Sequence, residues 1–256
     1  MDKRLKIAQR LIEKGMAALE APRRRNPFTG DEDADRVLNN IEEYPHVFVL
    51  GCIADRGMLS QKSWLAAYQW CRTVARENKL TFGNIRESVQ RPGPRISVRG
   101  RYPPTMTGHF YEAVKRMDTC YEGDAGQIWQ HNPVAATVVR RFLEFGGIGP
   151  KIANMATHIL LRDFKVRLRD KHMIDMPVDS NVIRVFERLG LIPEHSRENK
   201  RKELIICTAR ELCPGYPAVF DTGAWEIGSK WCGKRKRHPC PASCNMIDLC
   251  PGAHAP

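Results

Sequence analysis

Apolar residues recur at helical spacing along most of the chain, and the sequence has no sustained alternation of period two. The stripe nearest the N-terminus comprises Leu5, Ala8, Leu11, Ile12, Met16 and Leu19. Further stripes predict helices over residues 64–75, 110–117, 134–143, 152–160 and 182–189, the last of them ended by Gly190. The pattern predicts an all-α fold.

Two stretches interrupt this pattern. Residues 88–107 contain four prolines and the basic run Arg95-Ile-Ser-Val-Arg-Gly-Arg101, and they are predicted to form a long surface loop. Residues 164–177 are strongly charged and lie between two predicted helices.

Composition indicates a basic globular protein. The 256 residues are 42% hydrophobic, enough for a buried core, and carry a net charge of +12. This excess of Lys and Arg indicates a polyanionic partner, nucleic acid before membrane, with solubility as the alternative explanation. The longest apolar stretches, such as residues 46–54, are too short to span a bilayer, and the charged N-terminal segment is not typical of a signal peptide. We expect a monomer in a reducing intracellular compartment, the cytoplasm or nucleoid, without membrane association.

The segment Phe145-Gly-Gly-Ile-Gly-Pro-Lys-Ile-Ala-Asn154 joins two predicted helices. Gly147 and Gly149 permit positive φ and lack the Cβ atoms that would block another backbone. Pro150 suits the first turn of the next helix, whose free amides and positive dipole end favour a phosphate. Ile148 is then the apolar residue beneath the turn. We expect Gly147, Ile148 and Gly149 to hold a DNA backbone phosphate; a plain interhelical corner is the alternative.

Two ionisable residues follow the hairpin. Lys151 falls in the first helical turn, where the positive end of the helix dipole disfavours its charge. Partial burial acts in the same direction, towards a free amine able to attack carbon. Asp179 precedes the helix predicted over residues 182–189. It can orient or deprotonate an amine, or it can cap its helix, and the two roles are compatible.

Nine cysteines without a secretion signal indicate metal–thiolate chemistry rather than disulfides. Four near the C-terminus, Cys232, Cys240, Cys244 and Cys250, follow the spacing C-x7-C-x3-C-x5-C. This spacing lacks the paired C-x2-C knuckles of zinc sites and favours a [4Fe-4S] cluster, with zinc as the alternative. The other five, Cys52, Cys71, Cys120, Cys207 and Cys213, are interpreted as core thiols.

A basic run lies between the first two of these tail cysteines: Lys234, Arg235, Lys236 and Arg237. Metal ligands at both ends would make it a rigid finger that contacts DNA phosphates. The alternative is a run of solvated charge.

Together these motifs resemble the endonuclease III family of DNA glycosylases, in the helix-hairpin-helix superfamily. The family hairpin, L-P-G-V-G-x-K-T-A, corresponds to residues 145–153, and its attacking lysine to Lys151. The family segment V-D-T-H-V-x-R-V corresponds to residues 178–185, and its essential aspartate to Asp179. The cluster loop ending in E-D-L-C corresponds to the tail that ends at Cys250, with residues 225–232 as its lead-in. The resemblance covers residues 26–251 and is weak before residue 134.

This chain departs from the family pattern in three places. The family spacing C-x6-C-x2-C-x5-C is one residue shorter in each of its first two gaps. The interval from Lys151 to Asp179 is longer than in the family, and residues 164–177 are interpreted as an added loop near the DNA. The family glutamine that fills the gap left by a flipped base is missing, so Arg56 is the candidate for that role, with Gln61 behind it.

The resemblance implies a two-lobed helix-hairpin-helix DNA glycosylase fold with a C-terminal [4Fe-4S] cluster loop. One lobe is a six-helix barrel over residues 27–163, and the other combines residues 1–26 and 164–256. The implied partner is double-stranded DNA with a damaged base or an abasic site. The implied activity is excision of a damaged, oxidised base with associated AP (β-elimination) lyase activity. Two alternatives remain: a monofunctional glycosylase of the same fold acting on a mismatched, deaminated or alkylated base, and a non-catalytic DNA-binding iron–sulfur protein.

Overall fold

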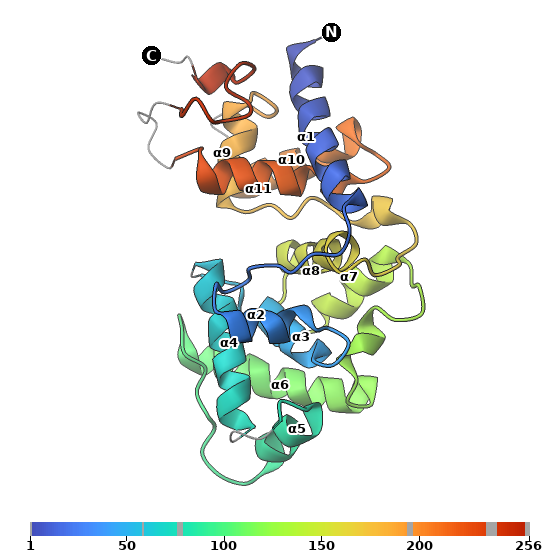
Figure 1. The fold of residues 1–256 in the computed structure, drawn as a ribbon, viewed down its shortest axis with the longest axis vertical. Coiled ribbons are helices and arrows are strands. Elements are labelled where there is room, and N and C mark those ends of the chain that lie inside the picture. Colours follow the sequence, from blue (N-terminus) through green and yellow to red (C-terminus); the bar gives the residue numbers. More distant parts are fainter. Residues whose placement is uncertain (1, 58, 76–78, 194–196, 234–239, 254–256) are drawn as a thin grey trace. The chain divides into compact units, whose positions relative to one another are not determined.

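A computed structural model of the protein describes residues 2–57, 59–75, 79–193, 197–233 and 240–253. In these ranges all regular secondary structure is helical, apart from one isolated parallel bridge between Val134 and Arg169. The predicted all-α class is therefore confirmed. The chain divides into two compact units (Figure 1). We call residues 22–169 the hairpin unit and residues 1–21 with 170–256 the cysteine unit. The boundaries predicted from the sequence, after residues 26 and 163, lie a few residues from these.

The hairpin unit contains α2 (Glu32–Asn39), α3 (Pro45–Ala54), α4 (Ser60–Val74), α5 (Phe82–Gln90), α6 (Pro103–Tyr121), α7 (Ala135–Leu143) and α8 (Pro150–Arg162). These are seven α-helices within the described residues of the unit, where six were expected. All ten residues of α3 are buried, and α3 packs against α2, α4, α6 and α8. A helix that is apolar on every side has no amphipathic period, so the hydrophobic pattern did not predict it.

The predicted loop over residues 88–107 is wrong at both ends. Helix α5 extends to Gln90, and α6 already begins at Pro103, because proline is tolerated in a first helical turn. The remaining segment is also anchored: the Ile96 carbonyl accepts a hydrogen bond from Trp70 Nε1, and Val98 is buried. Between the two helices the prediction of a surface loop is confirmed, because residues 91–102 form no helix and are mostly exposed, with Val98 as the buried anchor.

The charged stretch at residues 164–177 spans the boundary between the units and contains one short 3-10 helix, η2 (Lys171–Met173). Its end in the hairpin unit is fixed, because Arg169 exchanges backbone hydrogen bonds with Pro133 and Ala135. In the cysteine unit, Ile174 and Met176 are buried.

The cysteine unit contains α1 (Lys3–Glu20), α9 (Ser180–Arg188), α10 (Glu198–Leu212) and α11 (Phe220–Lys230) among its described residues. Helix α1 (blue in Figure 1) lies beside α11 (orange), although the two are far apart in the sequence. Gly15 of α1 lies against Val219, the residue just before α11, and a Cβ atom at Gly15 would stand 2.0 Å from the Val219 carbonyl oxygen. Gly190 directly follows the C-cap residue of α9 and has a φ of +69°, and Leu191 N donates to the Phe186 carbonyl. This is a Schellman ending, and it confirms the predicted stop.

Candidate active site and metal centre

The hairpin turn between α7 and α8 is tight and has an apolar base. Gly147 has a φ of +88°, and a Cβ atom there would stand 3.0 Å from Cδ2 of His109. Ile148 is buried beneath the turn, and Gly149 precedes α8 with Pro150 in its first turn. Gly149 differs from the expectation because its φ is −102°, and no described atom lies within 4 Å of its Cβ position. Gly147 is therefore needed for backbone conformation, whereas Gly149 leaves open space beside the start of α8.

Lys151 lies in the first turn of α8 and pairs with an acid that sequence reasoning did not single out. Its Nζ atom donates to Asp55 Oδ2 at 3.0 Å. The Asp55 side chain is only 8% exposed and that of Lys151 is 33% exposed. The second carboxylate oxygen, Oδ1, accepts a hydrogen bond from the Ser60 hydroxyl at 2.8 Å. The acid directly follows α3, so the buried helix fixes the position of this carboxylate.

This pairing changes the expected electrostatics of Lys151. The helix dipole and partial burial disfavour its charge, but a carboxylate at hydrogen-bond distance favours the ammonium form. Met155, one turn along α8, accepts a second contact from Nζ at 3.5 Å. The neighbouring Cys52 thiol is fully buried, and burial raises its pKa well above the usual value, with the Asp55 charge acting in the same direction.

The two candidates for filling a gap in a duplex are both exposed. Arg56 directs Nη1 towards the Gly147 carbonyl oxygen at 3.4 Å, so it lies against the hairpin turn. Gln61 lies in the first turn of α4. Sequence reasoning missed Tyr102, which is 62% exposed in a left-handed conformation, with the Arg101 guanidinium 5.1 Å from its ring. Arg101 also donates to the Gly57 carbonyl, which brings this aromatic residue to the Arg56 loop. Exposed aromatic and cationic groups of this kind suit contact with nucleic acid.

Asp179 is the N-cap of α9, as the structural interpretation predicted. Its Oδ1 atom accepts hydrogen bonds from the backbone N–H groups of Asn181 and Val182, both at 2.8 Å. The cap fixes the carboxylate at the start of α9, and it leaves Oδ2 without any role in capping. Asp179 and Lys151 belong to different units.

The four tail cysteines line one cavity of the cysteine unit, together with residues of α9, α11 and the tail itself. Cys232, Cys244 and Cys250 are buried and Cys240 is partly buried. Among the described residues, no three Cys, His, Asp or Glu side chains are grouped to hold a single metal ion. The rest of the lining is apolar apart from Arg188. Four thiols around a common cavity suit a cubane cluster, which takes one thiolate at each of its four irons.

Two arginines of α9 connect this helix to the cysteine loop. Arg184 donates to the carbonyl oxygens of Cys232 and Gly228, each at 2.8 Å. Arg188 donates from Nη1 to Cys232 Sγ at 3.2 Å. Sequence reasoning did not single out either residue. Their signal was available, since both follow the cap of α9 and lie four residues apart, so they share one helix face.

Burial raises the pKa of the Cys244 and Cys250 thiols, and the neighbouring cysteines act in the same direction. Ligation by a metal would require these thiols to lose their protons. The predicted basic finger, Lys234, Arg235, Lys236 and Arg237, lies outside the described residues.

The prediction of core thiols holds for Cys52 and Cys71, which are buried, and it is wrong for Cys120 and Cys207, which are exposed. Cys213 is partly buried. Cys120 lies in the last turn of a long helix, and Cys207 lies on the solvent side of α10, so an apolar neighbourhood in the sequence did not mean burial.

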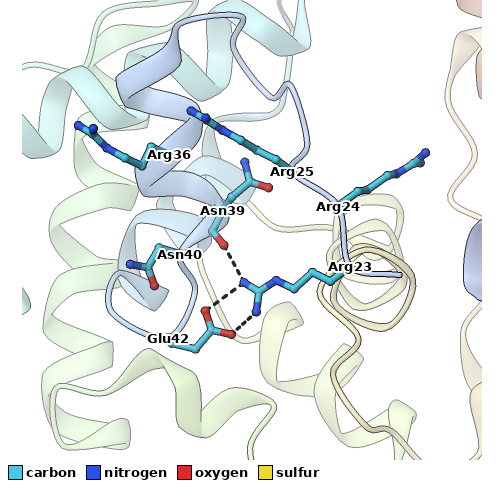
Figure 2. A pocket seen from close by; sticks show the side chains of 7 residues that line it. All are labelled: Arg23, Arg24, Arg25, Arg36, Asn39, Asn40 and Glu42. Carbon is cyan, nitrogen blue, oxygen red and sulfur yellow. Dashed lines mark hydrogen bonds and ion pairs between the residues drawn. The ribbon is translucent and has the colours of Figure 1, made fainter. Parts of the chain in front are cut away.

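An arginine-lined pocket is also present in the hairpin unit (Figure 2). Its lining comprises Arg23, Arg24, Arg25, Arg36, Asn39, Asn40 and Glu42. Arg23 turns towards Glu42 and the Asn39 carbonyl, while the ends of Arg24, Arg25 and Arg36 point away from that pair. The lining carries four guanidinium groups and one carboxylate, and two further acids lie next to it, since Arg36 pairs with Asp33 and Arg24 lies 3.9 Å from Asp163. The excess of cationic side chains over acids is the feature that a polyanion would use.

Among the helices of the described ranges, none combines the length and the apolar character required to cross a membrane. No protein-family model matches the chain. No curated protein matches it significantly.

Proposed function

We propose that this protein is a DNA glycosylase with associated AP lyase activity, acting on a damaged, oxidised base in duplex DNA. The observation that carries the proposal is the position of Lys151. An amine follows a glycine-rich interhelical turn directly, sits in the first turn of α8, and is held at 3.0 Å by a nearly buried carboxylate. A hairpin that only bound phosphate would have no use for a carboxylate that neutralises its lysine.

In this mechanism the hairpin turn binds a backbone phosphate near the lesion through its amides. The damaged base leaves the stack, because an enzyme cannot reach C1′ of a paired nucleotide inside the duplex. Arg56 fills the space left in the stack, with Gln61 behind it. The Lys151 amine attacks C1′, the bond from C1′ to the base breaks, and the base leaves with the bonding electron pair.

The covalent product is a Schiff base between Lys151 and the opened sugar. Loss of a proton from C2′ then breaks the C3′–O bond by β-elimination, which nicks the strand. Asp179 stabilises the positive charge that develops on the sugar.

The proposal includes a [4Fe-4S] cluster held by Cys232, Cys240, Cys244 and Cys250. When bound, the cluster would hold the four cysteines of the tail together and take no part in turnover. Support for a DNA partner comes from the net charge of +12 and from the arginine-lined pocket. We also propose that the protein acts as a monomer in a reducing intracellular compartment.

The test is reduction by borohydride during reaction with a panel of duplexes, each containing one lesion. Borohydride converts a Schiff base into a stable amine, so the wild type is expected to be trapped covalently on one or more duplexes. Lys151→Ala and Lys151→Arg are both expected to abolish trapping, because a guanidinium stays protonated and cannot act as the nucleophile. Efficient trapping by Lys151→Ala would show that the nucleophile is another residue.

A second candidate is a monofunctional glycosylase, favoured by the ion pair itself. In that case Asp55 would keep Lys151 as an ammonium throughout the reaction, and Asp179 would activate water instead. Base release without any trapping of the wild type would establish this alternative. If the protein bound lesion duplexes but released no base, it would be a non-catalytic DNA-binding protein.

A further inference from the structure

We infer that Asp55 is a catalytic residue, the base that receives the proton of the Lys151 ammonium as the amine attacks. This inference rests on the proposed function. A general base must lie within about 2.6–3.2 Å of the atom whose proton it removes. Asp55 Oδ2 meets that condition, at 3.0 Å from Lys151 Nζ.

The surroundings of Asp55 prepare it for this one contact. Ser60 donates to Oδ1, so the carboxylate is oriented and Oδ2 faces the amine. The side chain is only 8% exposed, which limits competition from water for Oδ2. Because Asp55 directly follows the fully buried α3, the carboxylate cannot move far from Lys151.

The neighbouring Cys52 thiol is not suited to the role. Cys52 feels the charges of both Asp55 and Lys151, but its burial keeps the thiol protonated. Met155 contacts Nζ from α8 and does not titrate. Arg56 follows Asp55 in the chain, is cationic, and turns its guanidinium to the hairpin carbonyl. The Asp179 carboxylate caps its own helix, which suits a fixed negative charge beside the sugar.

The proton balance of the step is simple. One N–H proton moves from Nζ to Asp55 Oδ2, and the freed lone pair forms the bond to C1′. The bond between C1′ and the base breaks, and the departing base takes a proton from solvent. Once β-elimination is complete and water has released the lysine, the protonated Asp55 returns its proton and the ion pair forms again.

The experiment measures single-turnover base release and borohydride trapping over a range of pH for the full-length protein. The variants are Asp55→Asn, Ser60→Ala and Lys151→Ala, with Asp124→Asn as a matched control. Asp124 is another carboxylate of the hairpin unit, a cap of the 3-10 helix at Ala125–Ile128, and asparagine caps equally well. Thermal melting of each variant checks its fold.

Asp55→Asn is expected to slow base release by about 100- to 10,000-fold at neutral pH, the usual contribution of a general base. Its rate should then rise about tenfold for each pH unit on the alkaline side, because the free amine forms without help only near the ordinary lysine pKa. Ser60→Ala should slow base release by a smaller factor and change its pH dependence in the same direction. Asp124→Asn should change neither the rate nor the pH dependence.

An Asp55→Asn rate equal to wild type would overturn the inference, and so would a loss of equal size at every pH, which indicates a structural role. If Asp55→Asn failed to fold, an unchanged rate and pH profile in Ser60→Ala would overturn it as well. The proposed function fails by a different result, a wild type that neither releases a base nor is trapped.

Discussion

Arg188 donates a hydrogen bond to the Sγ atom of Cys232 at 3.2 Å, from the same helix that Asp179 caps. Four residues earlier, Arg184 holds the Cys232 carbonyl oxygen. The residue proposed to act on the sugar and the first proposed cluster ligand are thus attached to one short helix. A substitution at one end of α9 should therefore change the behaviour of the functional group at the other end, which is either the Asp179 carboxylate or the Cys232 thiol.

We expect the purified protein to contain iron and to be brown, and Arg184→Ala to lose iron faster than wild type in a chelator. Arg184 donates to three backbone carbonyl oxygens, those of Cys232, Gly228 and Ser180, and to Asn181, so its removal should lower the free energy of unfolding by about 2–3 kcal/mol. Arg184→Lys should recover little, because an ammonium lacks the planar fork. Metal analysis and chemical denaturation provide the measurements. If metal analysis found zinc and no iron, the four cysteines would hold zinc and the proposed cluster would be wrong.

Gly147→Ala and Gly149→Ala should separate the backbone role of the hairpin from its surface role. At Gly147 the left-handed conformation costs alanine about 1–2 kcal/mol, and the new Cβ atom presses on His109. At Gly149 neither penalty applies, so only the smaller cost of replacing an N-cap glycine by alanine is expected, while the added methyl group obstructs a bound phosphate. Thermal melts and DNA-binding titrations test the pair. Unchanged DNA affinity in Gly149→Ala would favour the plain interhelical corner.

Asp179→Asn should keep the stability of wild type and lose most of its activity. Asparagine caps a helix as well as aspartate does, but it carries no charge to stabilise the sugar cation. Asp179→Ala should lose activity and about 1 kcal/mol of stability as well, since two backbone N–H groups lose their acceptor. Denaturation curves and single-turnover rates distinguish the two variants. Full activity in Asp179→Asn would reduce this residue to its capping role.

His46 should make the hairpin unit sensitive to acid. Its Nε2 atom lies 2.9 Å from the Leu80 carbonyl oxygen, and burial lowers its pKa to about 4 from the usual 6.5. The unfolded chain therefore binds the proton more readily, so stability falls as pH drops from about 6.5 to 4, by about 3 kcal/mol in total. His46→Gln should flatten this part of the stability curve. Equal slopes for the variant and wild type would contradict the assignment.

Two pairs of arginines should show which basic surface contacts DNA. Each phosphate contact that is lost lowers the slope of log affinity against log salt concentration by about 0.9. We expect Arg235→Ala with Arg237→Ala to reduce the slope equally for all DNA sequences. The matched double variant, Arg25→Ala with Arg36→Ala, tests the arginine-lined pocket of Figure 2 in the same titration. A slope that neither double variant changes would mean that both surfaces carry only solvated charge.

The amino-acid sequence by itself determined the features that depend on short spacing. Helical periodicity predicted α1, α4, α6, α7, α8 and α9, Gly190 marked the end of α9, and Asp179 was identified as a possible cap. The glycine turn before α8 was likewise evident, because Gly147 and Pro150 satisfy requirements of the local backbone. Cysteine spacing grouped the four tail thiols that line one cavity in the structure.

Only the tertiary structure decided which distant groups meet. Asp55 lies 96 positions before Lys151, and nothing in the spacing of either residue indicates the pair. The contact exists because α3 is buried in the centre of its unit and ends beside the first turn of α8. Arg188 and Cys232 meet for a similar reason, since α9 packs against α11 just before the cysteine loop begins. Local spacing determines how a helix starts and stops, whereas the partner of a charged side chain depends on which helices the core brings together.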